Sequence, residues 1–325
     1  MNPMTDYPAL GPWINGQLRA REEGSTSSVL NPATGDVVGT LPHASDADID
    51  EALAGARQAF AAWKRTSVME RSRVLRDAAA TLRRKSACIA THITLEQGKP
   101  RAEAQIEVNS SAEHLEWHAE ECRRLYGRVI PARGDSIHQY VVREPVGVVA
   151  ALTPWNFPIA IPSWKIAPAL AYGNCVVIKP ADLVPGCAWA IADIISRSGI
   201  PAGVFNLVMG RGSVVGEGII QHRDVNAISF TGSVGVGSRI AAAAAQKLKK
   251  VQLEMGGKNP QIVLDDADLK TAVELCVQSA FFSTGQRCTA SSRLIVTEGI
   301  YPKFIEAMKA RMATLKVDDA LKAGT

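Results

Sequence analysis

From Gly147 onward, short β-branched runs alternate with longer Ala-rich stretches, and this alternation limits the possible folds more than any other feature. The short runs predict buried strands and the longer stretches predict helices. Strands are expected at 148–152, 175–179, 204–208, 227–230, 251–254, 261–264 and 294–297. Helices are expected between them, for example at 159–172, before Gly173, and at 183–198, before Gly199. Such alternation builds βαβ units, so we expect a parallel sheet with helices on both faces.

The first part of the chain is organised differently. Residues 1–42 are rich in Pro, Gly, Asn and Ser and predict an irregular arm with one or two short strands. Residues 46–126 have apolar residues at helical spacing, preceded by the candidate N-cap Ser45. Residues 128–143 predict a β-ribbon, and the exposed edges of a ribbon usually need a partner.

The composition bounds the class of protein. A hydrophobic content of 46% and a charged content of 21% are typical of a soluble globular protein, and 325 residues suggest about two domains. The net charge of +4 contains no basic block, which argues against a nucleic-acid partner. Six cysteines without a Cys-x-x-Cys pair indicate neither a disulfide framework nor a metal site. The sequence shows neither a signal peptide nor a membrane-spanning run, so we expect a cytoplasmic enzyme.

Cys288 and Glu254 are the strongest candidates for chemistry, because a thiol nucleophile and the thioester it forms both require a nearby base. Cys288 lies in a polar, loop-like run, and Arg287 would favour its thiolate form if the guanidinium lies within reach. The other five thiols are interpreted as buried small hydrophobes: Cys88, Cys122, Cys175, Cys187 and Cys276. Alternatively, Glu254 has no catalytic role and is a carboxylate at a strand end whose hydrogen bonds are satisfied.

Two further segments each have a structural and a functional interpretation. Asn156, in Pro154–Pro158, either satisfies a turn or donates its side-chain NH₂ to an oxyanion together with the backbone N–H of Cys288. The glycine-rich run 230–237 follows a predicted strand and opens a helix, whose free N–H groups would suit a pyrophosphate. It is neither a Gly-x-Gly-x-x-Gly fingerprint nor a P-loop, and taken alone it predicts only a tight turn.

In combination, the segments 154–158, 230–237, 253–260 and 281–289 resemble those of the NAD(P)-dependent aldehyde dehydrogenase family. The resemblance covers essentially the whole sequence. It implies an α/β fold with a Rossmann-type cofactor domain at 1–125 and 147–255 and an incomplete catalytic domain at 256–325. It also implies an oligomerisation ribbon at 126–146 and a homodimer or homotetramer.

The resemblance assigns cofactor-binding roles. Thr231, Gly232 and Ser233 form the pyrophosphate loop, Trp155 borders the cofactor, and Gly212 and Gly216 pack near the adenosine.

The same resemblance implies that Lys179 and Asp182 hydrogen-bond the adenosine ribose. The Asp182 carboxylate accepts a 2′-hydroxyl and repels a 2′-phosphate, so NAD is favoured. NADP is the alternative, because Asp is shorter than Glu and Lys179 can hold a phosphate.

The resemblance also implies a mechanism for aldehyde oxidation. Cys288 attacks the aldehyde, Asn156 stabilises the oxyanion, and Glu254 activates the water that hydrolyses the thioester. Lys165 helps to move the proton. Phe157 and Trp164 wall the aldehyde entrance, although both are equally suited to a core.

For the substrate, the run 281–293 is similar to that of α-ketoglutaric semialdehyde (2,5-dioxopentanoate) dehydrogenases. Arg287 would bind the carboxylate at the far end of such a substrate, and succinate semialdehyde is the nearest alternative.

Family members continue beyond the position that matches Thr325, so we expect a C-terminally truncated chain that is inactive or nearly so. Two functions of other classes stay open. One is a cofactor-binding or structural relic of a dehydrogenase. The other is a thiol redox sensor, for which no resolving cysteine lies near Cys288 in the sequence.

Overall fold

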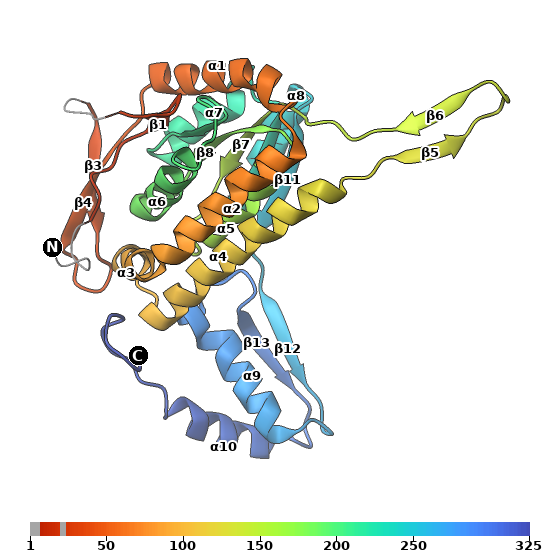
Figure 1. Cartoon of the computed structure of the whole chain (residues 1–325). Coiled ribbons are helices and arrows are strands. Elements are labelled where there is room, and N and C mark those ends of the chain that lie inside the picture. The colour runs from red at the N-terminus through yellow and green to blue at the C-terminus, as the bar shows by residue number, and fades with distance from the viewer. Residues whose placement is uncertain (1–6, 20–23) are drawn as a thin grey trace.

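A computed structural model describes residues 7–19 and 24–325 of the chain (Figure 1). In this described part, the largest sheet has seven strands in the order β11-β10-β7-β8-β9-β1-β2. Its parallel strands are β7 (Val148–Leu152), β8 (Cys175–Lys179), β9 (Phe205–Leu207), β10 (Ala227–Gly232) and β11 (Lys250–Met255). The predicted strands 148–152 and 175–179 are confirmed to the residue, and both are completely buried.

The predicted parallel sheet gains two antiparallel strands at one edge. There β1 (Trp13–Ile14) pairs antiparallel with β9 and with β2 (Gln17–Leu18). Trp13 and Ile14 are buried, so the N-terminal arm covers a strand edge that would otherwise be open. The same arm continues into a hairpin of β3 (Thr26–Leu30) and β4 (Val37–Pro42).

The predicted helical region is confirmed, and it forms four α-helices followed by a short 3₁₀ turn. These are α1 (Asp46–Trp63), α2 (Val68–Arg84), α3 (Ser86–Gln97), α4 (Arg101–Glu121) and η1 (Cys122–Arg124). Ser45 caps α1 through a capping box with Asp48, whose carboxylate accepts the Ser45 backbone N–H at 2.6 Å. Gly98 adopts the left-handed conformation that ends α3, with φ of 85°.

Helices cover the sheet, as the alternation predicted. Helix α1 packs against β7, β8 and β9, α5 against β7 and β8, and α8 against β10 and β11. The helices that connect the parallel strands are α5 (Ala160–Ala171), α6 (Pro185–Ser196), the π-helical turn η2 (Gly212–Gly216), α7 (Glu217–Gln221) and α8 (Val234–Gln246).

The strand order contains a reversal that positions the site. From β7 the chain moves outward through β8 to β9, and it then crosses to β10 and β11 on the other side of β7. Neighbouring strands β7 and β10 therefore send their following loops in opposite directions. In open α/β sheets, ligands bind beyond the carboxyl ends of the strands at such a switch point.

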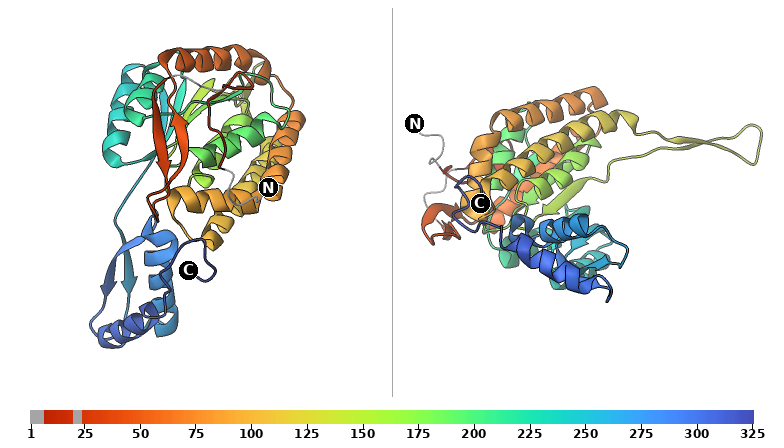
Figure 2. Two further views of the ribbon diagram at one scale, coloured as in Figure 1. Left: turned by 90° about the vertical axis from the view of Figure 1, so that its left-hand side faces the viewer. Right: turned by 90° about the horizontal axis from the view of Figure 1, so that it is seen from below.

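A ribbon projects from the body of the molecule, as Figures 1 and 2 show. It is formed by β5 (Arg128–Pro131) and β6 (His138–Val141), which pair antiparallel as the sequence predicted. Its apolar side chains are open to solvent: Val129 is 75% exposed and Tyr140 is 66% exposed.

The last part of the chain forms a smaller unit below the main sheet (Figure 1). The predicted strands near 261–264 and 294–297 do not join the large sheet but pair with each other in a two-stranded parallel sheet. The unit comprises β12 (Asn259–Val263), α9 (Leu269–Phe281), the 3₁₀ turn η3 (Phe282–Gly285), β13 (Ser291–Val296) and α10 (Tyr301–Met312). It has its own apolar core, which includes Val273, Cys276 and Phe304.

Within residues 7–19 and 24–325, every helix is too short or too polar to cross a lipid bilayer.

Candidate active site

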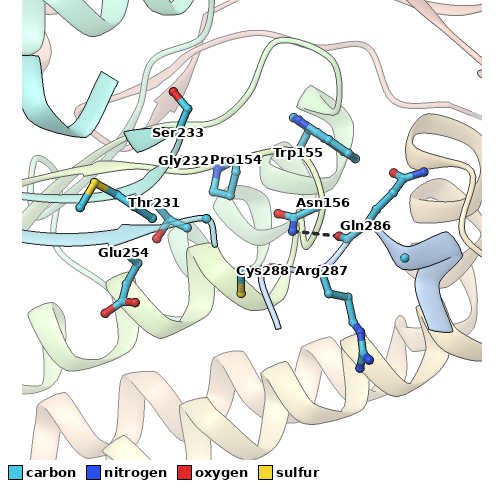
Figure 3. A pocket seen from close by; sticks show the side chains of 13 residues that line it. Pro154, Trp155, Asn156, Thr231, Gly232, Ser233, Glu254, Gln286, Arg287 and Cys288 are labelled. Atoms are coloured by element: carbon cyan, nitrogen blue, oxygen red, sulfur yellow. Dashed lines mark hydrogen bonds between the residues drawn. The ribbon is translucent and has the colours of Figure 1, made fainter. Parts of the chain in front are cut away.

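A pocket of about 310 Å³ lies at the switch point, between the ends of β7, β10 and β11 and the loop that carries Cys288 (Figure 3). It brings together predicted residues from four separate stretches of sequence: Trp155, Asn156, Thr231, Gly232, Ser233, Glu254, Arg287 and Cys288. The pocket is also lined by Pro154, Met255, Gly256, Gly285 and Gln286. A thiol, a carboxylate and an amide therefore share one cavity.

The backbone before Cys288 is strained. Ser283 and Thr284 have φ values of 53° and 55°, in the left-handed region that residues other than Gly seldom adopt. Such strain persists only where surrounding contacts hold it. One such contact is the Ser283 N–H, which donates to the Glu103 carboxylate on α4 at 2.6 Å. The loop presents Cys288 as an exposed thiol.

Asn156 lies in the loop after β7, opposite the cysteine loop. Its side-chain Nδ2 donates to the backbone oxygen of Gln286 at 3.0 Å, the contact drawn in Figure 3. An amide NH₂ carries two hydrogens, so this bond fixes the side chain and leaves a second hydrogen for a carbonyl oxygen bound near Cys288. The arrangement suits an oxyanion donor.

Glu254 is the penultimate residue of β11 and accepts a hydrogen bond from Gln252 Nε2 at 2.9 Å. Gln252 in turn meets Ser229, its cross-strand neighbour on β10, at 2.6 Å. Lys165 Nζ donates to both, at 2.9 Å to Ser229 Oγ and 3.4 Å to Gln252 Oε1. The predicted Lys165 is thus linked to Glu254 through a polar side chain rather than directly.

Ser229 and Gln252 were not predicted from the sequence. A signal was present, because residues two apart on a strand share a face and Gln252 precedes Glu254 by two. The cross-strand register that adds Ser229 was not readable from one sequence.

The Lys165 ammonium is costly to bury. Burial lowers its pKa from 10.5 to about 8, and the charge of Glu254 partly offsets this effect. Between these two values the unfolded chain binds a proton that the folded chain does not. The contribution of Lys165 to stability therefore rises with pH from about 8 to 10.5, and its penalty is complete below 8.

We expect Lys165→Met to abolish this part of the pH dependence. The free energy of unfolding of the unchanged chain, minus that of the variant, should rise by about 2 kcal/mol between pH 7.5 and 10. Urea unfolding of both proteins at several pH values measures the difference. The pKa values of Lys179 and Lys249 are also lowered by burial, but these lysines are common to both proteins and cancel. A difference that does not change with pH would contradict the prediction.

A second crevice, of about 280 Å³, lies between η2, α7 and α8 and is lined by Gly212, Ser213, Glu217, Val236, Arg239 and Ile240, among others. Lys179 ends β8 beside it and is buried, which lowers its pKa to about 8. A side chain added at Gly212 would meet Lys179 Nζ at 4.0 Å, and one at Gly216 would meet its Cδ at 3.8 Å. These are ordinary van der Waals distances, and they place the backbone of η2 beside the lysine.

These features fit a dinucleotide. Helix α8 starts at the pocket, where the Ser233 hydroxyl accepts the Val236 N–H at 3.4 Å and caps the helix. The remaining N–H groups of its first turn, and the helix dipole, favour an anion. Ser233 lines the pocket of Cys288 and Val236 lines the crevice, so the start of α8 borders both cavities.

The side chains of three predicted residues lie apart from this arrangement. The Arg287 guanidinium donates to the backbone oxygens of Gln278 and Ser279, at 3.3 and 3.2 Å, and stacks on Phe282. Arg287 is among the residues that line the pocket, but its side chain points away from Cys288 in Figure 3. The contacts therefore do not bring this cation to the thiol or to a bound carboxylate.

The two aromatic residues predicted at the aldehyde entrance also lie outside the lining of the pocket. The Phe157 ring faces Lys99 Nζ at 4.0 Å from its centroid. The Trp164 side chain is 45% exposed, so it is not part of a core.

One of the five thiols that were predicted to be buried is partly exposed. Cys122, Cys175, Cys187 and Cys276 are buried as predicted, but Cys88 is only half-buried. Its sulfur lies 3.9 Å from His92 Nε2 on the next turn of α3. Among the residues that the structure describes, no cluster of three His, Cys, Asp or Glu side chains is arranged to hold a metal ion.

Comparison with known proteins identifies related chains. Residues 19–325 match the model of the aldehyde dehydrogenase family. The α-ketoglutaric semialdehyde dehydrogenase of Bacillus subtilis is 44% identical over 99% of this chain and 66% of its own length. The NADP(+) succinate-semialdehyde dehydrogenase of Escherichia coli is 40% identical over 96% of this chain and 64% of its own.

The fold is shared with solved structures. The NAD⁺ complex of betaine aldehyde dehydrogenase from Staphylococcus aureus superposes with a TM-score of 0.96 at 32% identity, over 100% of this chain and 65% of that one. The chain thus spans just under two thirds of the length of these relatives.

Proposed function

Since the chain belongs to the aldehyde dehydrogenase family, we propose that its chemistry is the NAD(P)-dependent oxidation of an aldehyde to a carboxylic acid. The observation that carries the proposal is the pocket shared by Cys288, Glu254 and Asn156. No two of these residues are neighbours in sequence, yet together they supply a nucleophile, a base and an oxyanion donor.

The residues divide the reaction between them. The Cys288 thiolate attacks the aldehyde carbon, and the free Asn156 N–H donates to the oxygen as it becomes negative. When bound, the nicotinamide supplies the acceptor for the hydride that leaves this carbon. Glu254 then takes a proton from the water that attacks the resulting thioester, and the cysteine leaves as thiolate. Lys165 polarises Glu254 through Gln252.

For the substrate we propose a semialdehyde, with 2,5-dioxopentanoate first and succinate semialdehyde as the alternative. The likeness to semialdehyde dehydrogenases of both kinds supports this class. The role predicted for Arg287 in binding the distant carboxylate gains no support from its present contacts.

A single-turnover measurement tests the proposed function. Because we expect this chain to turn over only slowly, the measurement uses NAD and chain in excess over aldehyde. We expect reduced nicotinamide to form from 2,5-dioxopentanoate faster than from an uncharged aldehyde of the same length. Absorbance of the reduced nicotinamide measures it. Formation that needs no Cys288, or that is absent with every aldehyde, would refute the proposal.

For the cofactor we propose NAD, on the strength of Asp182 beside Lys179. Replacing the carboxylate with Asp182→Ser should tighten the binding of NADP roughly tenfold and change that of NAD by less than about threefold, because one repulsive charge is removed. Quenching of tryptophan fluorescence measures both dissociation constants without turnover. Asp36→Ser, at an exposed position in the turn between β3 and β4, is the matched control. Unaltered NADP binding in Asp182→Ser would contradict the assignment.

For the ribbon we propose a contact with a second copy of the chain in a homodimer or homotetramer. Its exposed Val129 and Tyr140 support this, since apolar side chains on a projecting arm are normally covered by a partner.

A further inference from the structure

A buried ion pair lies behind the loop that carries Asn156. Lys99 Nζ is 2.6 Å from Glu107 Oε2, and each side chain is only 1% exposed. Lys99 follows the end of α3 and Glu107 lies on α4, so neither is part of the sheet or of the cysteine loop. Burying two charges is unfavourable unless each finds several partners, and the identity of those partners indicates what the pair is for.

Within the described residues, the other hydrogen-bond partners of these two charged groups belong to one short segment. Lys99 Nζ donates to the backbone oxygen of Asn156 at 2.8 Å and lies over the Phe157 ring. Glu107 Oε1 accepts the backbone N–H groups of Ile159 and Ala160, at 2.9 and 3.1 Å. The pair therefore holds the middle of the loop between β7 and α5 and the start of α5.

The other side of Asn156 is held as well. Gln97 Oε1 accepts the Lys99 N–H at 3.0 Å, and Gln97 Nε2 donates to Gln286 Oε1 at 3.0 Å. The backbone oxygen of Gln286 in turn accepts the Asn156 side chain. The backbone of Asn156 is thus fixed by Lys99, and its amide is fixed by a residue that Gln97 holds.

From these contacts we propose that Lys99 and Glu107 are positioning residues for the oxyanion donor Asn156. They do not reach the pocket themselves. They set the direction of the one Asn156 hydrogen that is left for a carbonyl oxygen, and small displacements of such a donor have large effects on rate. The inference rests on the proposed function, because it concerns attack by Cys288 on a carbonyl.

The experiment uses acylation by p-nitrophenyl acetate, which needs no cofactor. Attack by the Cys288 thiolate forms an acetyl thioester and releases one nitrophenolate per chain as a burst. The test variant is Lys99→Met/Glu107→Gln, which removes both charges together, keeps the side-chain volumes similar, and retains an oxygen to accept the Ile159 and Ala160 N–H groups. The control is Arg83→Met/Glu116→Gln, an exposed pair that also joins α4 to a neighbouring helix.

We expect the maximal acylation rate of the test variant to fall roughly 10- to 100-fold, with less than about a threefold change in the half-saturating ester concentration. The control should acylate at the rate of the unchanged chain. A general loss of structure would not separate the two constants in this way.

A double-mutant cycle with Asn156→Ala isolates the coupling. This substitution alone should slow acylation about 10²- to 10³-fold, the usual effect of removing an oxyanion donor. Adding the Lys99/Glu107 changes should then cost less than about threefold more, because the group that they position is gone. Full additivity would overturn the inference, as would wild-type acylation by a folded test variant.

Circular dichroism establishes whether the test variant is folded. If it is not, Gln97→Met decides, because it breaks the bond to Gln286 without leaving a charge unpaired. We expect Gln97→Met to slow acylation about three- to tenfold when Asn156 is present and to have no effect when Asn156 is replaced by Ala. An unchanged acylation rate in the presence of Asn156 would overturn the inference. A burst that is absent from the unchanged chain, or that survives Cys288→Ala, would instead refute the proposed function.

Discussion

Cys288→Ala is expected to abolish the nitrophenolate burst, lowering acylation by at least about 10³-fold, because the other nucleophilic groups in the pocket, which include the Thr231 and Ser233 hydroxyls, are much weaker nucleophiles than a thiolate. The pocket holds one thiol, and the carboxylate of Glu254 is a much weaker nucleophile toward an ester. Stopped-flow absorbance at the nitrophenolate band measures the loss.

Cys88→Ser is the matched control, since Cys88 is the other thiol that is not buried. This variant should keep the full burst. In the unchanged chain, iodoacetamide should modify Cys288 first, and the four buried thiols should react only after unfolding. A burst that persists in Cys288→Ala, or disappears in Cys88→Ser, would show that the nucleophile was assigned wrongly.

Glu254→Gln is expected to separate the two halves of the reaction. The burst should keep an amplitude of one per chain, because the thiolate can still attack, whereas release of the acetyl group should slow by about 10²- to 10⁴-fold for want of a base. Mass spectrometry should then detect a chain that carries one acetyl group on Cys288 for much longer than in the unchanged protein.

Glu298→Gln serves as its control, because Glu298 is an exposed carboxylate outside both cavities. It should release the acetyl group at the unchanged rate. If Glu254→Gln loses the burst itself, the carboxylate acts in the attack rather than in hydrolysis. If both steps are unaffected, Glu254 is only a strand-end carboxylate.

Individual strands were easier to predict from the sequence than the pairing between them. The strands 148–152 and 175–179 were predicted to the residue because β-branched runs bounded by turn residues leave few alternatives. The partners of the strands were less accessible. Pairing of β1 with β9 joins Trp13 to Leu207, and no periodic pattern within either segment encodes a contact over such a separation.

The sequence alone determined the types of the helices and strands, through local periodicity, and the chemical roles for which Cys288, Glu254 and Asn156 are suited. Only the tertiary structure decided which side chains support them. In the structure, the Arg287 cation lies at the end of α9. Gln252 lies between Lys165 and Glu254, and the ion pair of Lys99 and Glu107 contacts the backbone of Asn156. The physical reason is that periodicity reports which face of an element is apolar, whereas a hydrogen bond between distant segments depends on where the packed elements place individual atoms.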